Sequence, residues 1–317
     1  MNPNAPAVAL NDLQKIYTSR KSKERKEALK GVTFDIPRGA FFGLLGPNGA
    51  GKSTLINILA GTVNKSSGDA AICGYDITRE TRRAKMSLGV VPQELIVDTF
   101  FTVREALDIH AGYYGVPKEK RRTNTIIEAL GLTQQADMNS RRLSGGMRRR
   151  LLVAKALVHN PPVLILDEPT AGVDVELRRQ LWDYVVELNK QGTTVLLTTH
   201  YLEEAQELCD TIGIINNGQV IALDRKDALM RRMDRKQLVI TPTDTLGALP
   251  PGLPGEITLT PEGQLVIAYA PSKLSVEEIL SRVRESGVSI RDLATVEPKL
   301  EDVFRKMMKE DGNKKAA

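Results

Sequence analysis

Nine consecutive residues constrain this chain more than any others, because they contain the eight-residue phosphate-binding pattern G-x-x-x-x-G-K-[ST] in full. They are Gly46, Pro47, Asn48, Gly49, Ala50, Gly51, Lys52, Ser53 and Thr54. The apolar run at 40–45 predicts a buried strand before them, and residues 55–60 continue at helical spacing up to Gly61. A strand, a glycine-rich loop and a helix in this order predict a cradle for phosphate groups.

Each residue type in this loop has a predicted task. The glycines let backbone N–H groups point at phosphate oxygens, and the start of the helix adds the positive end of its dipole. Lys52 should reach the β- and γ-phosphates of a nucleotide, and Ser53 should hold Mg²⁺. A glycine-rich turn without a ligand is the alternative, and the other motifs of the chain decide between the two.

The composition limits the classes of protein to which this chain can belong. The sequence has 317 residues, of which 41% are hydrophobic and 26% are charged, so it is long enough for two globular domains. It contains no run of about 18 apolar residues, and its start lacks the profile of a signal peptide. Its two cysteines, Cys73 and Cys209, give no disulfide framework and no metal-binding spacing. We expect a soluble chain in a reducing compartment, with at most peripheral contact to a membrane.

The net charge of +5 does not by itself predict a nucleic-acid partner. It reflects 44 basic against 39 acidic residues, and a mixed, solvated surface accounts for so small an excess. Basic residues cluster at 20–26, 148–150 and 231–232. These clusters lack the interleaved aromatic residues of a surface that stacks on bases. No specific nucleic-acid partner is therefore expected.

Two candidate site residues stand near the ends of predicted strands. Residues 8–18 predict an edge strand, which a charged hairpin loop joins to a strand at 31–36. Tyr17 lies near the end of the first strand, where it either stacks on an adenine ring or fills the core or the surface. A further strand at 88–93 ends at the polar residue Gln93.

A mostly helical insert is predicted at about 94–158. Its first helix starts at Thr102 as the N-cap residue, and Glu105 completes a capping box. Phe101 is placed to pack against this helix as a hydrophobic staple.

A second anion site is predicted at the end of this insert. Ser144, Gly145 and Gly146 precede an amphipathic helix at 148–158, and a helix N-terminus attracts anions. A serine and two glycines before a helix are also a common turn, so this interpretation depends on the order of the motifs along the chain.

Two adjacent carboxylates end a predicted buried strand at 163–168. These carboxylates, Asp167 and Glu168, stand at the carboxyl end of the strand, where doubly wound sheets bind ligands. Because side chains alternate along a strand, we expect different tasks for the two. Asp167 can hold Mg²⁺ through its water shell, and Glu168 can orient an attacking water or accept its proton.

A histidine ends the next buried strand, which is predicted at 194–200. A single histidine at a strand end is usually structural. His200 is expected at the same sheet edge as Lys52 and Glu168, and an imidazole can donate a hydrogen bond to an anion. We therefore predict a hydrogen bond from His200 to the γ-phosphate.

Taken together and in this order, the motifs resemble those of ABC-transporter ATPase subunits. The resemblance covers about residues 8–232 and rests on Tyr17, the loop 46–54, Gln93, Leu143-Ser144-Gly145-Gly146-Met147, the strand 163–168, Ala171-Gly172-Val173-Asp174 and His200. The sequences at 168–174 and 200–205 are most similar to ABC-2-type exporters. The resemblance implies an α/β fold with a P-loop NTPase core, an antiparallel β-subdomain and a helical subdomain.

The same resemblance implies a site for ATP and Mg²⁺. The implied catalytic residues are Glu168, His200 and Gln93, and the implied metal ligands are Ser53, Gln93 and Asp167. The implied ATP contacts are Tyr17, residues 46–54, Ser144, Gly145, Gly146 and Asp174. Many family members have Gln where this chain has Met147. The resemblance implies a dimer, and this difference concerns only the tuning of its interface.

Two partners are implied by the resemblance. A second copy is needed because the signature sequence of one chain, residues 143–147, cannot reach the phosphate loop of the same chain. Two chains would therefore pair head to tail around two ATP molecules. The other partner is an integral membrane permease, expected to dock near 94–114, a segment that contains Leu95, Ile96, Phe100, Phe101, Tyr113 and Tyr114. Such a permease would hold the chain in the cytoplasm, on the inner face of the cell membrane.

The sequence changes character at about residue 236. Predicted short strands and helices alternate with Pro/Gly-rich segments from there on, which predicts a small α+β domain at 236–310. It resembles the accessory C-terminal domain of exporter ATPases, and a structural or regulatory role is expected.

Two other functions compete with export. An ABC-type ATPase acting on DNA would carry a long coiled coil, for which the segment between Lys52 and Ser144 is too short. One acting on ribosomes would carry two cassettes, and this sequence has one. A nucleotide-gated scaffold with little turnover is disfavoured by Glu168, which is the expected base.

Overall fold

The computed structural model describes residues 4–18, 24–244 and 246–316. The chain forms two compact units, Met1–Arg225 and Lys226–Ala317. Residues 20–23 of the first basic cluster lie outside the described residues. Within the described ranges, no helix is both long and apolar enough to cross a membrane.

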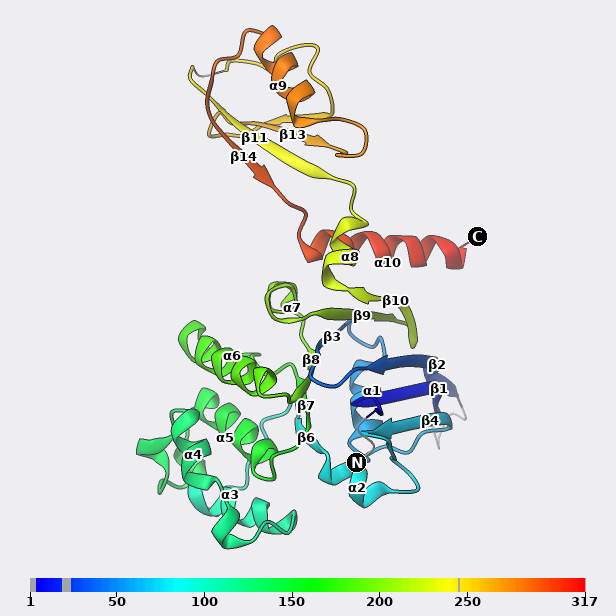
Figure 1. Cartoon of the computed structure of the whole chain (residues 1–317), viewed down its shortest axis with the longest axis vertical. Helices are drawn as coiled ribbons and strands as arrows, with labels where there is room; N and C mark the ends of the chain where they lie inside the picture. The colour runs from blue at the N-terminus through cyan, green and yellow to red at the C-terminus, as the bar shows by residue number, and fades with distance from the viewer. Residues whose placement is uncertain (1–3, 19–23, 245, 317) are drawn as a thin grey trace. The chain divides into compact units, whose positions relative to one another are not determined.

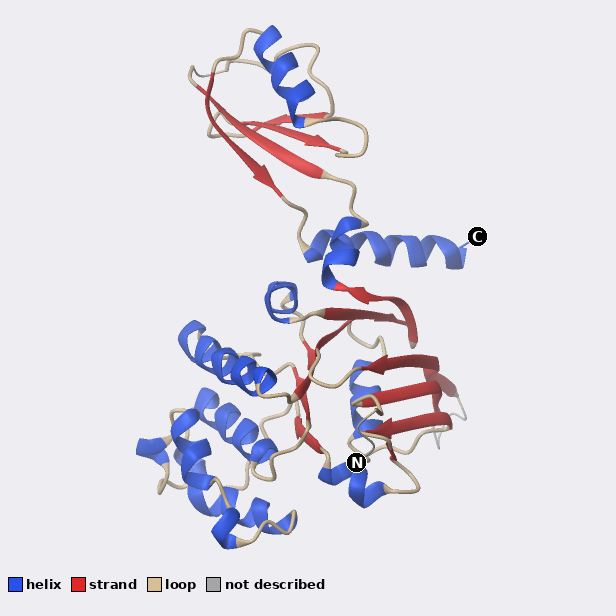
Figure 2. Cartoon of the chain, in the orientation of Figure 1, coloured by secondary structure: helices blue, strands red, loops and turns tan. Residues whose placement is uncertain are grey.

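A six-stranded sheet forms the centre of the first unit (Figures 1 and 2). Its order is β10 (Gln219–Arg225), β9 (Thr211–Asn216), β3 (Phe41–Leu45), β8 (Thr194–Thr198), β7 (Val163–Asp167) and β6 (Leu88–Val91). Every neighbouring pair is parallel except β10 and β9. All residues of β3, β7 and β8 are buried, because other elements of the fold pack on both faces of a parallel sheet.

The parallel register brings the predicted site segments to one edge of this sheet. The phosphate loop leaves the carboxyl end of β3, and Gln93 follows β6. Glu168 follows β7, and His200 lies just beyond β8. Segments that are far apart in the sequence therefore meet at the edge where open α/β sheets bind ligands.

A four-stranded sheet packs near the phosphate loop. Its order is β2 (Arg25–Ile36), β1 (Val8–Thr18), β4 (Ser67–Ile72) and β5 (Tyr75–Asp76). Helix α1 (Lys52–Leu59) contacts β2 and β4 of this sheet and β7 of the other, so its buried residues join one core with both sheets. Strand β2 starts earlier than the sequence predicts, because Arg25 and Lys26 pair with Thr18 and Tyr17 of β1. The predicted charged hairpin loop is correspondingly shorter.

A group of helices follows β6 in the sequence, and Figure 1 shows it beside the six-stranded sheet. Its helices α3 (Val103–Tyr113), α4 (Thr123–Ala129) and α5 (Gly145–Leu157) contact one another. Thr102 caps α3 as predicted: its hydroxyl accepts from the Glu105 N–H at 3.2 Å, and the Glu105 carboxylate accepts from the Thr102 N–H at 2.9 Å. Further α-helices among the described residues of the unit are α2 (Thr81–Met86), α6 (Val175–Lys190) and α7 (Leu202–Leu208).

The second unit has a core of its own. Its antiparallel sheet has the order β12 (Glu256–Leu259), β13 (Leu265–Tyr269), β11 (Lys236–Pro242) and β14 (Ile290–Val296). Helix α9 (Val276–Glu285) packs Ile279 and Val283 against this sheet. The unit begins before residue 236, because α8 (Lys226–Arg231) contacts α10 (Leu300–Ala316). Residue 236 marks the first strand of the unit and not its boundary.

Candidate functional site

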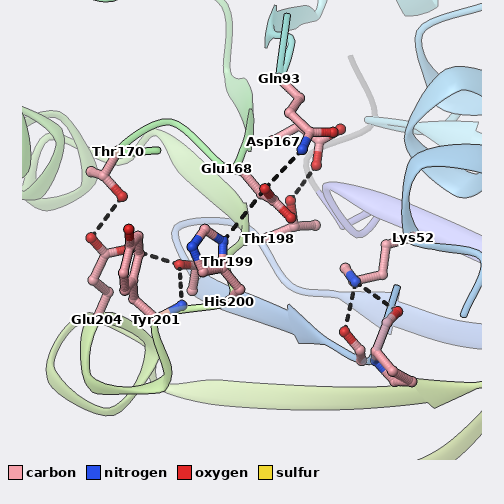
Figure 3. Close-up of polar contacts among 12 residues, drawn as sticks. Lys52, Gln93, Asp167, Glu168, Thr170, Thr198, Thr199, His200, Tyr201 and Glu204 are labelled. Atoms are coloured by element: carbon pink, nitrogen blue, oxygen red, sulfur yellow. Dashed lines mark hydrogen bonds and ion pairs between the residues drawn. The ribbon is translucent and has the colours of Figure 1, made fainter. Parts of the chain in front are cut away.

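Lys52 is the first residue of α1, and its side chain is held by the loop that joins β3 to α1 (Figure 3). It is only 8% exposed, and its Nζ donates to the carbonyl oxygens of Gly46 at 2.6 Å and Pro47 at 3.1 Å. Burial lowers the pKa of Lys52, while the nearby carboxylates of Glu168 and Asp167 raise it. A partly desolvated ammonium gains from any anion placed beside it, so Lys52 is suited to bind phosphate.

Two glycines let the loop pass close to neighbouring strands. Gly51 has a φ of 114°, and a Cβ at this position would lie 2.7 Å from the carbonyl oxygen of Ala28 in β2. A Cβ at Gly46 would lie 2.3 Å from the carbonyl oxygen of Ile215 in β9. Any larger residue at either position would push the loop away from the sheets. The glycines of the motif are therefore required by the fold of the loop itself.

A pocket of about 400 Å³ lies over this loop, which is within the size range of small-molecule sites. It is lined by Tyr17, Lys26, Ala28, Asn48, Gly49, Ala50, Gly51, Lys52, Ser53, Thr54, Gln93 and Glu168. Tyr17 is 40% exposed, and Lys15 Nζ lies 4.7 Å from the centre of its ring. The ring therefore stands at the wall of the pocket and not in the core.

Glu168 is held between the two other predicted catalytic residues. Gln93 Nε2 donates to Glu168 Oε2 at 2.9 Å, and His200 Nδ1 lies 3.4 Å from the same oxygen. The backbone of Glu168 has a φ of 48°, a left-handed conformation that non-glycine residues seldom adopt and that concentrates at functional sites. These contacts join the ends of β6, β7 and β8 around one carboxylate (Figure 3).

Asp167 faces a more enclosed environment than Glu168. It is 7% exposed and accepts a hydrogen bond from the Thr198 hydroxyl of the neighbouring strand. Burial raises the pKa of Asp167, and the Thr198 hydrogen bond opposes this shift. Thr198 was not among the predicted site residues, because a threonine inside an apolar strand carries no sequence signal of its own.

Glu204 is a further buried carboxylate that the sequence does not identify. It accepts from Thr170 Oγ1 at 2.7 Å, from Thr199 Oγ1 at 2.8 Å and from Trp182 Nε1 at 3.3 Å. Thr170 follows Glu168 closely, and Thr199 precedes His200 directly. Glu204 thus fixes the segments that carry both residues (Figure 3). The sequence does not identify Glu204 because an acidic residue in a predicted helix is usually exposed to solvent.

The basic cluster at 148–150 is not the solvated surface that the sequence predicts. Arg149 is 3% exposed and Arg150 is 8% exposed. Arg149 donates to the carbonyl oxygens of Pro92 at 2.8 Å and Gln93 at 2.9 Å. Arg150 donates to those of Leu130 at 2.9 Å and Gly131 at 3.1 Å. These carbonyl oxygens pair with Nη atoms of both buried guanidinium groups, whereas Nε of Arg149 and of Arg150 is buried without a partner among the described residues.

The predicted second anion site lies apart from the pocket. Ser144 is the N-cap of α5, and its hydroxyl accepts from the Met147 N–H at 3.3 Å. Ser144 and Gly145 are exposed, and Asp174 lies just before α6. Among the described residues, none of these three lines the pocket over the phosphate loop. Within one chain, the structure brings the loop, Tyr17, Gln93, Glu168 and His200 together, but not the Ser144 segment.

Oxygen donors suited to Mg²⁺ come from three segments at the sheet edge. Ser53 offers a hydroxyl, Gln93 an amide oxygen and Asp167 a carboxylate. Hard cations such as Mg²⁺ prefer oxygen ligands of these kinds. The donor set therefore fits the ion that a bound triphosphate would carry.

Comparisons with known proteins agree with this geometry. A family model described as ABC transporter matches residues 29–171. The Nod factor export ATP-binding protein I of Ralstonia nicotianae is 41% identical over 230 residues, which are 72% of this chain and 72% of that protein. The daunorubicin resistance ATP-binding protein DrrA3 of Streptomyces coeruleorubidus is 33% identical over 98% of both chains. The second similarity spans both units.

A solved structure is also similar. It is the dimeric ATP-binding cassette MJ0796 in a post-hydrolysis state, bound to ADP and Pi. It has a TM-score of 0.64 and 26% identity, and it covers 69% of this chain and 98% of its own. Its fold matches the P-loop NTPase fold of the ABC type that the sequence predicts. The chain belongs to the ATP-binding proteins of the ABC transporter family.

Proposed function

We propose that this chain is the ATP-binding and ATP-hydrolysing subunit of an exporter and that it powers transport through a separate ABC-2-type membrane permease. One observation carries the proposal. At a single sheet edge, buried Lys52 lies in a phosphate loop, and Glu168 is held by Gln93 and His200. This arrangement can bind a triphosphate and position a base for hydrolysis.

In this proposal, the triphosphate lies on residues 46–54 and the adenine ring stacks on Tyr17. Mg²⁺ bound by Ser53, Gln93 and Asp167 would offset the negative charge of the phosphates. Lys52 moves from the loop carbonyl oxygens to the β- and γ-phosphates.

Glu168 orients the attacking water and accepts its proton. Gln93 and His200 hold the Glu168 carboxylate oxygen in place, at 2.9 Å and 3.4 Å. His200 also donates a hydrogen bond to the γ-phosphate. Different residues of the pocket thus bind the phosphates and activate the water.

A second copy of the chain completes each site in this proposal. Ser144, Gly145 and Gly146 of one copy contact the ATP held by the loop of the other, and Asp174 crosses the interface. The similarity to a cassette whose solved structure is dimeric supports a dimer, and the head-to-tail arrangement is our proposal. ATP binding closes the dimer and hydrolysis reopens it, because the γ-phosphate contributes contacts to both copies.

The permease docks on an exposed apolar surface in this proposal. This docking surface consists of Leu95, Ile96, Phe100 and Tyr113, which are 40%, 70%, 85% and 81% exposed. Tyr114 belongs instead to the packing of the helices, because its ring stacks on His159 with centroids 3.6 Å apart. Docking would place the chain at the cytoplasmic face of the membrane.

Hydrolysis tests the proposed reaction directly. Glu168→Gln should reduce ATP turnover by about two to four orders of magnitude, because the positioned base is lost, and should leave ATP binding intact. The matched control is Glu187→Gln, the same change at an exposed position of α6. Turnover of Glu168→Gln close to that of the control would refute the role of Glu168.

Co-purification with the permease tests the docking surface. Phe100→Ala and Ile96→Asp should spare ATP binding by the isolated subunit and weaken the complex or uncouple transport from hydrolysis. Met86→Ala is the control, because Met86 is also exposed (41%) but lies on α2. If both variants assemble and transport like the control, the permease binds elsewhere.

A further inference from the structure

Arg149 connects the helix that carries the signature sequence to the catalytic carboxylate. Its Nη1 and Nη2 donate to the carbonyl oxygens of Pro92 and Gln93 at 2.8 Å and 2.9 Å. The side chain of Gln93 in turn donates to Glu168 at 2.9 Å. Two consecutive hydrogen-bonded steps thus lead from α5 to the predicted base.

The first step of this connection, from Arg149 to the backbone at 92–93, is buried and doubly hydrogen-bonded. A planar guanidinium that holds two carbonyl oxygens fixes both position and angle. Arg149 is 3% exposed, so water cannot readily replace these bonds. Ser144 caps the same helix, about five residues and about 7.5 Å along the axis from Arg149. A displacement of the helix start therefore moves the backbone of Gln93.

We propose that Arg149 is a positioning residue that links the two nucleotide sites of the dimer. When Ser144, Gly145 and Gly146 contact the ATP held by the partner copy, Arg149 sets the position of Gln93, and through it of Glu168, in its own site. This inference rests on the proposed function, because it needs the head-to-tail dimer. The proposed link explains why Arg149 is buried between α5 and the segment after β6.

Arg150 provides a matched comparison within the same helix. It is also buried and also donates to two carbonyl oxygens, those of Leu130 and Gly131. Both acceptors follow α4, inside the helical group. Removing either guanidinium should cost similar stability, but only Arg149 contacts the segment that carries Gln93.

The test compares Arg149→Met with Arg150→Met in steady-state ATP hydrolysis by the full chain. Arg149→Met should lower kcat by about 10- to 100-fold, as small misplacements of catalytic groups do, with KM changed less than about threefold. The Hill coefficient for ATP should fall from near 2 toward 1, because the two sites are no longer linked. Arg150→Met should change kcat by less than about threefold. Its Hill coefficient should equal that of the wild type within error. Arg149→Lys, which keeps one donor, should lie between Arg149→Met and wild type.

A double-mutant cycle separates this link from a structural role. In a Gln93→Ala background, Arg149→Met should cause no further loss of kcat, because Arg149 acts through Gln93. Additive losses, or equal losses for Arg149→Met and Arg150→Met at equal thermal stability, would overturn the inference and leave the proposed function standing. Absence of hydrolysis by the wild-type chain would overturn both.

Discussion

Lys52 shows how a single ammonium group can prepare a site for a polyanion. It lies at the first residue of α1, and its two acceptors are backbone oxygens of its own loop. Its partial desolvation raises the free energy of the charged form, which the lowered pKa reflects. A triphosphate in the pocket relieves this cost, so nucleotide affinity should depend strongly on this side chain.

Replacing this lysine should therefore weaken nucleotide binding. Lys52→Ala should raise the Kd for a fluorescent ATP analogue by about 10- to 100-fold, which corresponds to about 1.5–3 kcal/mol for hydrogen bonds to a charged group. Lys85→Ala is the control, since Lys85 is exposed on α2 and its Nζ lies 3.5 Å from the Gly61 carbonyl oxygen. An unchanged Kd would show that the phosphates bind elsewhere.

The sequence predicts the residues that occur in ordered motifs and misses those that act through burial. Lys52, Glu168 and His200 are predicted because each ends or follows a strand in a recognisable order. Arg149 and Glu204 are not, because their partners lie 56 and 34 residues away in the chain. A charged residue in a helix pattern is usually solvated, and only the fold shows that these two are buried.

At the scale of elements, three aromatic rings join α3 to the end of α5. The His159 ring stacks on Tyr114, and the His110 ring lies 5.4 Å from Tyr114. His159 Nε2 is 3.1 Å from the Leu88 carbonyl oxygen, to which it donates as a neutral ring. His159 Nδ1 is buried without a partner among the described residues. Protonation of His159 would therefore create a buried N–H donor at Nδ1 that has no acceptor among the described residues. Burial lowers the pKa of both His110 and His159 to about 4.

These two histidines should make the first unit less stable in mild acid. Between pH 6.5 and about 4 the unfolded chain binds protons that the folded chain does not, so the free energy of unfolding falls as the pH falls through this window. Urea unfolding at pH 7 and pH 5 should show a loss of about 1 kcal/mol per histidine, because partial exposure reduces the full effect.

A variant separates this effect from the titration of other groups. His159→Phe keeps the aromatic stack but cannot titrate, so its loss of stability between pH 7 and pH 5 should be smaller than that of the wild type. An equal loss in both proteins would contradict the assigned role of His159.

Elements with local signals were easier to predict than elements with distant partners. Thr102 and Glu105 form a capping box within four residues, and α3 starts as predicted. The strand pair β9 and β10 was not predicted, although β9 completes the parallel sheet beside β3. The early start of β2 depends on its pairing with β1, and a charged segment gives no sign of such pairing.

At the scale of the whole molecule, the two units have separate hydrophobic cores. The first core joins both sheets through α1, and the second joins α9 to the sheet of β11 to β14. The predicted nucleotide contacts all lie in the first unit. We therefore expect a structural or regulatory role for the second unit.

The proposed dimer follows from a separation within the first unit. The phosphate loop and Glu168 line one pocket, whereas Ser144 caps α5 in the helical group. In the proposed function, one chain therefore offers two incomplete halves of a nucleotide site, and a head-to-tail pair would combine them. ATP would lie in the interface and hold the pair together.

Sedimentation velocity of Glu168→Gln tests this central claim most directly, because slow hydrolysis lets the ATP-bound state accumulate. The account predicts monomers without nucleotide, dimers with ATP and Mg²⁺, and monomers with ATP when Ser144→Arg is added, since a bulky cation then fills the second half-site. The Ser144→Arg chain should still bind ATP. ATP-saturated Glu168→Gln that stays monomeric, or Ser144→Arg that dimerises normally, would contradict the account.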